Sequence, residues 1–132
     1  MIVVDTNVIA YLFIKGDYTE FAENLLKMDP DWISTPLWRS EFRSVLSLYI
    51  RKNKLTIGDA TEISHIAEEF MDGREFNVDS EYLFNLVTLS SCSSYDCEFV
   101  ALAQSFKLTL YTSDTKIVNE FPHTAKLLKN IK

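Results

Sequence analysis

The chain has 132 residues, of which 47% are hydrophobic and 13% aromatic, and its formal net charge at pH 7 is -6. This length fits one domain, so residues 1–132 are expected to form a single compact unit with one core. The apolar content excludes a disordered chain. The acidic balance argues against a protein whose whole surface grips nucleic acid, although a local basic patch can coexist with an acidic total.

Nothing in the sequence predicts secretion or membrane insertion. No apolar run approaches the roughly 20 residues that cross a bilayer, and Asp5 ends the opening run before a signal-peptide core could form. We therefore expect a cytoplasmic protein with no membrane association. Cys92 and Cys97 fit neither a redox pair nor a zinc knuckle and are expected to be reduced. His65 and His123 are isolated and are assigned no role.

The first third of the chain predicts two strands separated by two helices. Residues 2–4 form an apolar, β-branched run typical of a buried parallel strand. A helix closed near Gly16 follows, because apolar side chains recur at three- and four-residue intervals: Val8, Ile9, Leu12 and Phe13. Asp17 and Glu20 resemble a capping box for a second helix, and residues 32–35 predict the second strand.

The middle of the chain is expected to be mainly helical. Pro36 suits the first position of a long helix that reaches about Arg51. Thr56 caps another helix, which ends at Asp72-Gly73. A brief strand is expected at residues 75–78.

The last part of the chain continues the alternation. Asp79 or Ser80 caps one helix, and Ser93 or Ser94 caps the next. The remaining predicted elements are a helix at 95–106, a strand at 108–111, a helical turn at 116–118, a break at 121–122 and a weak strand at 127–128. Strands that alternate with helices indicate an α/β sandwich around a mostly parallel sheet.

Three aspartates stand at the starts of predicted helices. Asp5 and Asp114 each follow a predicted strand, and Asp96 opens the helix whose apolar stripe begins at Phe99. Because open α/β sheets bind ligands at the carboxyl ends of their strands, all three are candidate site residues. Taken alone, each is explained equally well as a helix cap or as a charge that favours the helix dipole.

Glu41 lies on the apolar face of its predicted helix, four residues from both Leu37 and Val45. A carboxylate among apolar side chains is costly unless it is paired or binds a metal. The alternative is an ion pair with an Arg at the edge of the core, or a position at the rim from which Glu41 reaches water.

The combination of these acids predicts a divalent-metal site at one edge of the sheet, formed by Asp5, Glu41, Asp96 and Asp114. Clustered carboxylates raise one another's proton affinity unless cations compensate. Ligands that are all oxygen favour Mg²⁺ or Mn²⁺ over zinc. Such an ion can activate water for attack on a phosphodiester, which needs no Ser, His or Cys nucleophile.

Four segments carry a resemblance in order and spacing over almost the whole chain: Val4-Asp5-Thr6-Asn7-Val8-Ile9, Glu41, Tyr95-Asp96-Cys97-Glu98-Phe99-Val100-Ala101-Leu102-Ala103 and Thr112-Ser113-Asp114. They resemble the PIN-domain family and, within it, the small VapC-like toxins of toxin-antitoxin pairs. The resemblance implies a three-layer α/β/α sandwich with a five-stranded parallel sheet. It also implies a ribonuclease that hydrolyses single-stranded or loop RNA with one or two Mg²⁺ or Mn²⁺ ions.

The resemblance also implies roles for individual residues. Asp5 and Asp96 would be the main metal ligands, Asp114 would help to hold the ion or its water, and Glu41 would orient water or a second ion. Supporting contacts would come from Thr6 and Thr112. Family members often carry a further acid shortly after the last Asp, where this chain has Thr115 and Asn119, which puts a tightly bound second metal in doubt.

Partners follow from the same resemblance. The family implies a homodimer and a small antitoxin protein that covers the active site. RNA contact is expected from Arg39 and Arg43, which flank Glu41 on its helix. The end of that helix carries Arg51, Lys52 and Lys54. They are interpreted either as part of a phosphate-steering patch or, in preference, as a solvated helix face.

Two other functions compete with this one. A phosphatase of the haloacid-dehalogenase kind would use Asp5 as nucleophile, but Asn7 replaces its general acid. A receiver-like module with an acidic pocket, which is not an enzyme, would need a Lys after its last core strand. Lys116 is a poor candidate for that role because it lies so close to Asp114.

Overall fold

The computed structural model, which describes residues 1–131, has a parallel sheet at its centre. The strands follow the order β2-β1-β3-β4, and every pairing between neighbours is parallel. Their bounds are Ile2–Val4 for β1, Trp32–Ile33 for β2, Leu110–Thr112 for β3 and Ala125–Leu127 for β4. All carboxyl ends of the strands therefore meet at one edge of the sheet.

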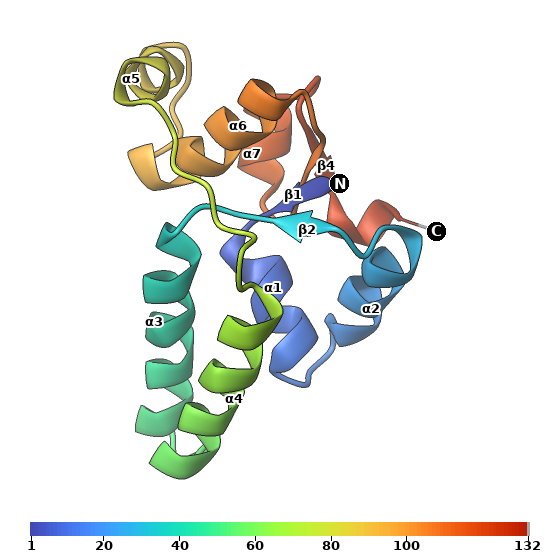
Figure 1. Ribbon diagram of the computed structural model, residues 1–132, viewed down its shortest axis with the longest axis vertical. Coiled ribbons are helices and arrows are strands. Elements are labelled where there is room, and N and C mark those ends of the chain that lie inside the picture. The colour runs from blue at the N-terminus through green and yellow to red at the C-terminus, as the bar shows by residue number, and fades with distance from the viewer. Residues whose placement is uncertain (132) are drawn as a thin grey trace.

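Helices cover both faces of this sheet (Figure 1). Their bounds are Thr6–Phe13 for α1, Thr19–Met28 for α2, Leu37–Arg51 for α3, Ile57–Phe70 for α4, Ser80–Thr88 for α5, Ser94–Phe106 for α6 and Thr115–Glu120 for α7. A 3-10 turn at Leu128–Asn130 follows β4. Among the described residues, no helix combines the length and apolar character that crossing a bilayer requires.

Alternation along the strands explains the two layers of the core. Successive strand side chains point to opposite faces, so Ile2 and Val4 pack with α1 to α4 while Val3 packs with α5 to α7. Ile33 and Leu110 join the second group. The predicted three-layer α/β/α sandwich is therefore confirmed.

The strand lengths differ from the prediction. The expected strand at residues 75–78 is reduced to a single parallel bridge between Ser34 and Glu75, so the sheet has four strands beside that bridge. The last two strands also begin at other residues than expected, at Leu110 and at Ala125. Apolar runs mark strands well, but hydrogen bonding to a neighbour decides where each begins.

The helix starts were predicted more accurately than the strands. Thr56 forms a capping box with Asp59, Asp79 caps α5, and Ser93 caps α6. The capping box at Asp17 is wrong, because α2 begins after Tyr18 and no side chain caps it. The Thr19 hydroxyl closes this turn instead, where it accepts from the Gly16 N–H at 2.9 Å and donates to the Tyr11 carbonyl at 2.7 Å.

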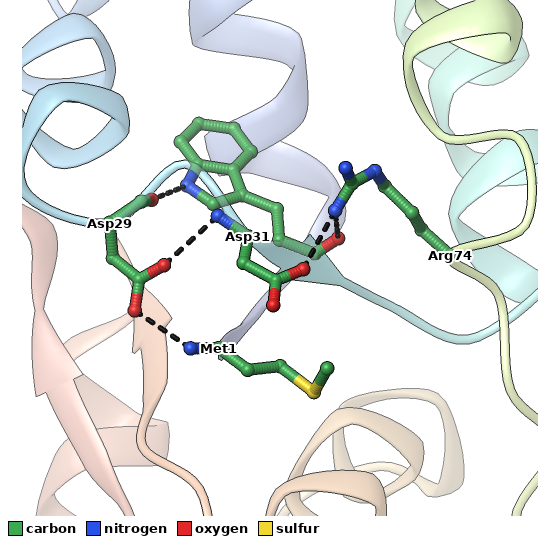
Figure 2. A network of polar contacts seen from close by, with 5 residues as sticks. Met1, Asp29, Asp31 and Arg74 are labelled. Atoms are coloured by element: carbon green, nitrogen blue, oxygen red, sulfur yellow. Dashed lines mark hydrogen bonds and ion pairs between the residues drawn. The ribbon is translucent and has the colours of Figure 1, made fainter.

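A polar network fastens the edge of the sheet where the strands begin (Figure 2). The Asp29 carboxylate accepts from the Met1 amino group and from the Asp31 N–H, each at 2.9 Å. Arg74, after α4, donates to the Asp31 carboxylate at 2.8 Å. The Trp32 indole donates to the Asp29 carbonyl at 2.9 Å. Both acids at this edge therefore have a cationic partner.

The start of α6 offers a test of helix capping. Ser93 Oγ accepts from the Asp96 N–H at 3.1 Å. Replacement by Ala in Ser93→Ala leaves that N–H without its partner and should lower the free energy of unfolding by about 1 kcal/mol in urea denaturation. Ser94→Ala, one residue later and outside the cap, is the matched control and should change it little. Equal losses in the two variants would contradict this account of the helix start.

Candidate functional site

One cavity lies at the edge of the sheet where β1 and β3 end. It has a volume of about 260 Å³, and all four acids predicted from the sequence line it: Asp5, Glu41, Asp96 and Asp114. The other lining residues are Thr6, Asn7, Ser44, Val45, Phe99 and Ile117. The chain thus brings together acids that lie up to 109 positions apart in the sequence.

Asp5 is the most buried of these acids, with an exposed fraction of only 6%. It follows β1 directly and caps α1, where its Oδ1 atom accepts from the Val8 N–H at 3.2 Å. Its Oδ2 atom accepts from the hydroxyl of Thr112 at the end of β3. Asp5 is therefore both a cap and a cavity residue, so the two interpretations of its position do not compete.

Thr112 connects two of the acids. Its buried hydroxyl donates its hydrogen to Asp5 and accepts from the Asp114 N–H at 3.0 Å. Asp114 in turn caps α7, with its Oδ1 atom accepting from the Lys116 N–H at 2.9 Å. The end of β3 thereby fixes Asp5 and Asp114 relative to each other.

Glu41 reaches the cavity from α3. The Thr6 hydroxyl donates to Glu41 Oε1 at 2.7 Å, which ties α3 to the first residue of α1. Glu41 is half-buried beside Val45, so the sequence correctly placed a carboxylate on a face that turns inward. Its partner is a hydroxyl and not the Arg that the alternative interpretation proposed.

Asp96 stands in the first turn of α6 and is half-buried. Burial raises the pKa of the Asp96 carboxyl above its usual 3.8, and the negative charge of Asp114 adds to this rise. The positive charge of Lys116 only partly offsets it.

The electrostatics of Asp5 are more extreme. Burial raises its pKa from the usual 3.8 to about 6, against the hydrogen bonds from Thr112 and Val8, and the charges of Glu41 and Asp96 act in the same direction as burial. No Lys, Arg or His is among the residues that line the cavity. The ionised form of the site is therefore poorly compensated by the residues around it.

A divalent cation fits this chemistry. Four carboxylates supply hard oxygen ligands of the kind that Mg²⁺ and Mn²⁺ prefer. Within residues 1–131, however, no three acidic, His or Cys side chains stand close enough together to enclose an ion. The cavity is thus an open arrangement of carboxylates and not a closed cage.

Some residues near the site escaped the sequence analysis. Glu98, two residues after Asp96, has its pKa raised by burial, with Glu41 adding to the rise. The buried hydroxyl of nearby Thr35 partly offsets this rise. The sequence shows that Glu98 lies two residues after Asp96 on the same helix. Because glutamates on helices are mostly exposed to solvent, nothing in the sequence indicated that Glu98 is partly buried.

The arginines expected to contact RNA lie outside the cavity lining. Arg39 forms ion pairs with Glu68 at 3.0 Å and with Glu75 at 3.6 Å, and its guanidinium lies over the Trp38 ring. Arg43 is exposed on α3. Their contact with RNA stays a prediction, and for Arg39 it would compete with these two acids.

Comparisons with known proteins agree on the fold. A family model described as PIN domain matches residues 2–127. FitAcB from Neisseria gonorrhoeae has a similar structure, with a TM-score of 0.75 and 19% identity over 98% of this chain and 99% of that one. PAE2754 from Pyrobaculum aerophilum gives a TM-score of 0.76 and 14% identity over 96% and 90% of the two chains.

A third similar structure is a toxin-antitoxin complex from Klebsiella pneumoniae. Its TM-score is 0.67, with 18% identity over 97% of this chain and 98% of that one. No curated protein sequence matches the chain significantly. At such low identities the similar structures show the fold alone.

The raised pKa of Asp5 predicts a gain in stability when its charge is removed. As pH rises from about 4 to about 6, the unfolded chain loses the Asp5 proton while the folded chain keeps it, so the folded state loses stability. In chelator at about pH 7.5, Asp5→Asn should raise the free energy of unfolding by up to about 3 kcal/mol. The gain should vanish below about pH 4, where both states of the wild type are protonated.

Asp5→Asn keeps the cap, because the Asn side-chain oxygen can still accept from the Val8 N–H. Asp17→Asn, at an exposed position, is the control and should leave stability unchanged. Urea denaturation across pH measures both. Destabilisation by Asp5→Asn at neutral pH would contradict the electrostatic account.

Proposed function

Because the chain belongs to the PIN domain family, we propose that it is a metal-dependent endoribonuclease that hydrolyses RNA phosphodiester bonds with Mg²⁺ or Mn²⁺. The observation that carries the proposal is the convergence of Asp5, Glu41, Asp96 and Asp114 on one cavity that lacks cationic side chains. A phosphodiester is itself an anion, so a bound cation would have to offset both substrate and site. Family membership favours this proposal over a phosphatase or a receiver-like module.

The residues that line the cavity would have different roles in binding the metal and orienting water. When bound, the ion supplies a Lewis acid and lowers the pKa of its water. Asp5 and Asp96, the two acids of the cavity lining whose pKa values burial raises, would hold it. Asp114 and Glu41 would orient water at the rim. Thr112 and Thr6 would support them by fixing the carboxylates of Asp5 and Glu41 through their hydroxyl groups.

Cleavage of a single-stranded RNA tests the proposal. Asp5→Asn and Asp96→Asn should each lower kcat/KM by about 100-fold or more, since each removes a charged ligand while nearly preserving shape. EDTA should abolish activity, and Mn²⁺ or Mg²⁺ should restore it. Glu69→Gln on the exposed side of α4 is the matched control. Cleavage that persists in chelator, or in Asp5→Asn, would refute the metal-dependent mechanism.

We further propose that the chain acts in the cytoplasm as the toxin of a toxin-antitoxin pair, as a homodimer restrained by a small antitoxin protein. One of the similar structures is a toxin-antitoxin complex, and the two chains align over nearly their full lengths. Large exposed apolar side chains, including Phe84, Leu89 and Ile57, are available for association.

Expression in a bacterial host tests this biological role. Wild-type protein should arrest growth, and Asp96→Asn should relieve the arrest because it removes catalysis and leaves the surface unchanged. Immunoblotting controls for equal protein levels. Equal growth arrest by the wild type and Asp96→Asn would show that the toxicity does not come from the acidic cavity.

A further inference from the structure

A second cavity lies beside the acidic one. It has a volume of about 110 Å³ and is lined by Tyr11, Tyr18, Ser113, Leu127, Leu128 and Lys129. Ser113 directly precedes Asp114, and Tyr11 follows Asn7 by four residues on α1. Asn7 and Asp114 both line the acidic cavity. Since one helical turn spans about 5.4 Å, the two cavities are neighbours along α1 and along the segment after β3.

Aromatic rings form one wall of this second cavity. The Tyr11 and Tyr18 ring centroids are 5.0 Å apart with the planes inclined by 31°, and Tyr18 also packs against Phe21 with a centroid distance of 5.8 Å. The Tyr11 hydroxyl donates to Ser113 Oγ at 3.1 Å, which fixes its ring. Tyr18 remains 45% exposed. The wall is thus held in place from behind while one of its rings stays accessible.

Lys129 supplies a positive charge at the same cavity. It is exposed and belongs to the 3-10 turn after β4, which the buried Leu128 anchors. Among the described residues Lys129 forms no ion pair, unlike Arg39 and Arg74, whose guanidinium groups are engaged by acids. An aromatic wall next to an unengaged ammonium suits a nucleotide, since rings stack on a base and the ammonium binds phosphate.

We propose that this cavity binds one nucleotide of a single-stranded RNA next to the bond that is cleaved, with the base against Tyr18 and a phosphate on Lys129. The inference rests on the proposed function and names a part of its substrate. A base within a duplex is paired and stacked, whereas an unpaired base can turn into such a cavity. Stacking on tyrosine accepts every base, so the subsite favours single strands without selecting a sequence.

Binding of a mononucleotide is the first arm of the test. Adenosine 5′-monophosphate is titrated into the full chain in chelator, and amide chemical shifts are followed by NMR. The amides of Tyr18, Ser113 and Lys129 should shift, and ribose 5-phosphate, which lacks the base, should bind at least about tenfold more weakly. Tyr18→Leu should weaken the nucleotide about tenfold, while Tyr18→Phe, which keeps a ring, should bind within about twofold of wild type.

Cleavage of RNA is the second arm, and it separates a strand from a free nucleotide. Tyr18→Leu and Lys129→Gln should each lower kcat/KM for single-stranded RNA by about 5- to 10-fold, mainly through KM, and Tyr18→Phe should restore it. The matched controls are Phe106→Leu, at an exposed aromatic at the end of α6, and Lys27→Gln, at an exposed lysine on α2. Both controls should stay within about twofold of wild type.

The outcomes distinguish the subsite from the activity. Cleavage that depends on Asp5 but not on Tyr18 would overturn the subsite and leave the proposed function standing, whether or not the mononucleotide binds. RNA binding that depends on Tyr18 and Lys129 without any cleavage would support the subsite and refute the function. Ribose 5-phosphate that binds as well as the nucleotide would also overturn the subsite, because the base would then contribute nothing.

Discussion

The candidate site is governed by a single electrostatic constraint, the gathering of four carboxylates at one edge of a parallel sheet. Asp5 is buried there with its pKa raised to about 6, and the cavity lining contains no cationic side chain. Hydroxyl groups from Thr6 and Thr112 contact Glu41 and Asp5, but hydroxyls cannot neutralise charge. The native fold thus retains an unfavourable charge distribution that a bound cation would relieve.

At the opposite edge of the sheet, where the strands begin, the acidic side chains are paired with positive groups. Asp29 and Asp31 each meet a positive group there, the Met1 amino group and Arg74 respectively. Pairing of this kind leaves no demand for an external ion. One edge of the sheet has its acidic charges compensated and the other has them poorly compensated. This contrast locates the candidate site more specifically than the presence of acids does, because poorly compensated groups concentrate where proteins bind and react.

Much of the fold could be predicted from the sequence because local signals agree with it. Caps such as Thr56, Asp79 and Ser93 act on backbone groups within three residues, so their effect is visible without tertiary structure. The strand at 75–78 could not be predicted correctly, since it pairs only through one bridge, to Ser34 directly after β2, and this pairing depends on distant contacts. Asp17 does not cap α2, and Thr19 closes the turn before that helix through a contact with the carbonyl of Tyr11, which no local pattern reveals.

The candidate site divides in the same way. Position after a strand marked Asp5 and Asp114, a helix start marked Asp96, and an inward helix face marked Glu41. The four acids could therefore be found in advance. The resemblance implied that Thr112 supports the acids, but not which atoms it contacts. The burial of Glu98 and the pairing of Arg39 with Glu68 were not expected, because they depend on side chains from separate elements. The second cavity, which Tyr18 lines, is likewise built from four separate segments, and nothing in the sequence predicts that these segments meet.

Binding of Mn²⁺ to the purified chain, followed by electron paramagnetic resonance, tests the central electrostatic claim most directly. The wild type should bind Mn²⁺ at neutral pH, and its affinity should fall as Asp5 becomes protonated below about pH 6. Asp5→Asn should bind it at least about tenfold more weakly. If the wild type binds no Mn²⁺, or if Asp5→Asn binds it equally well, the carboxylates at this edge are not gathered for a cation and the account fails.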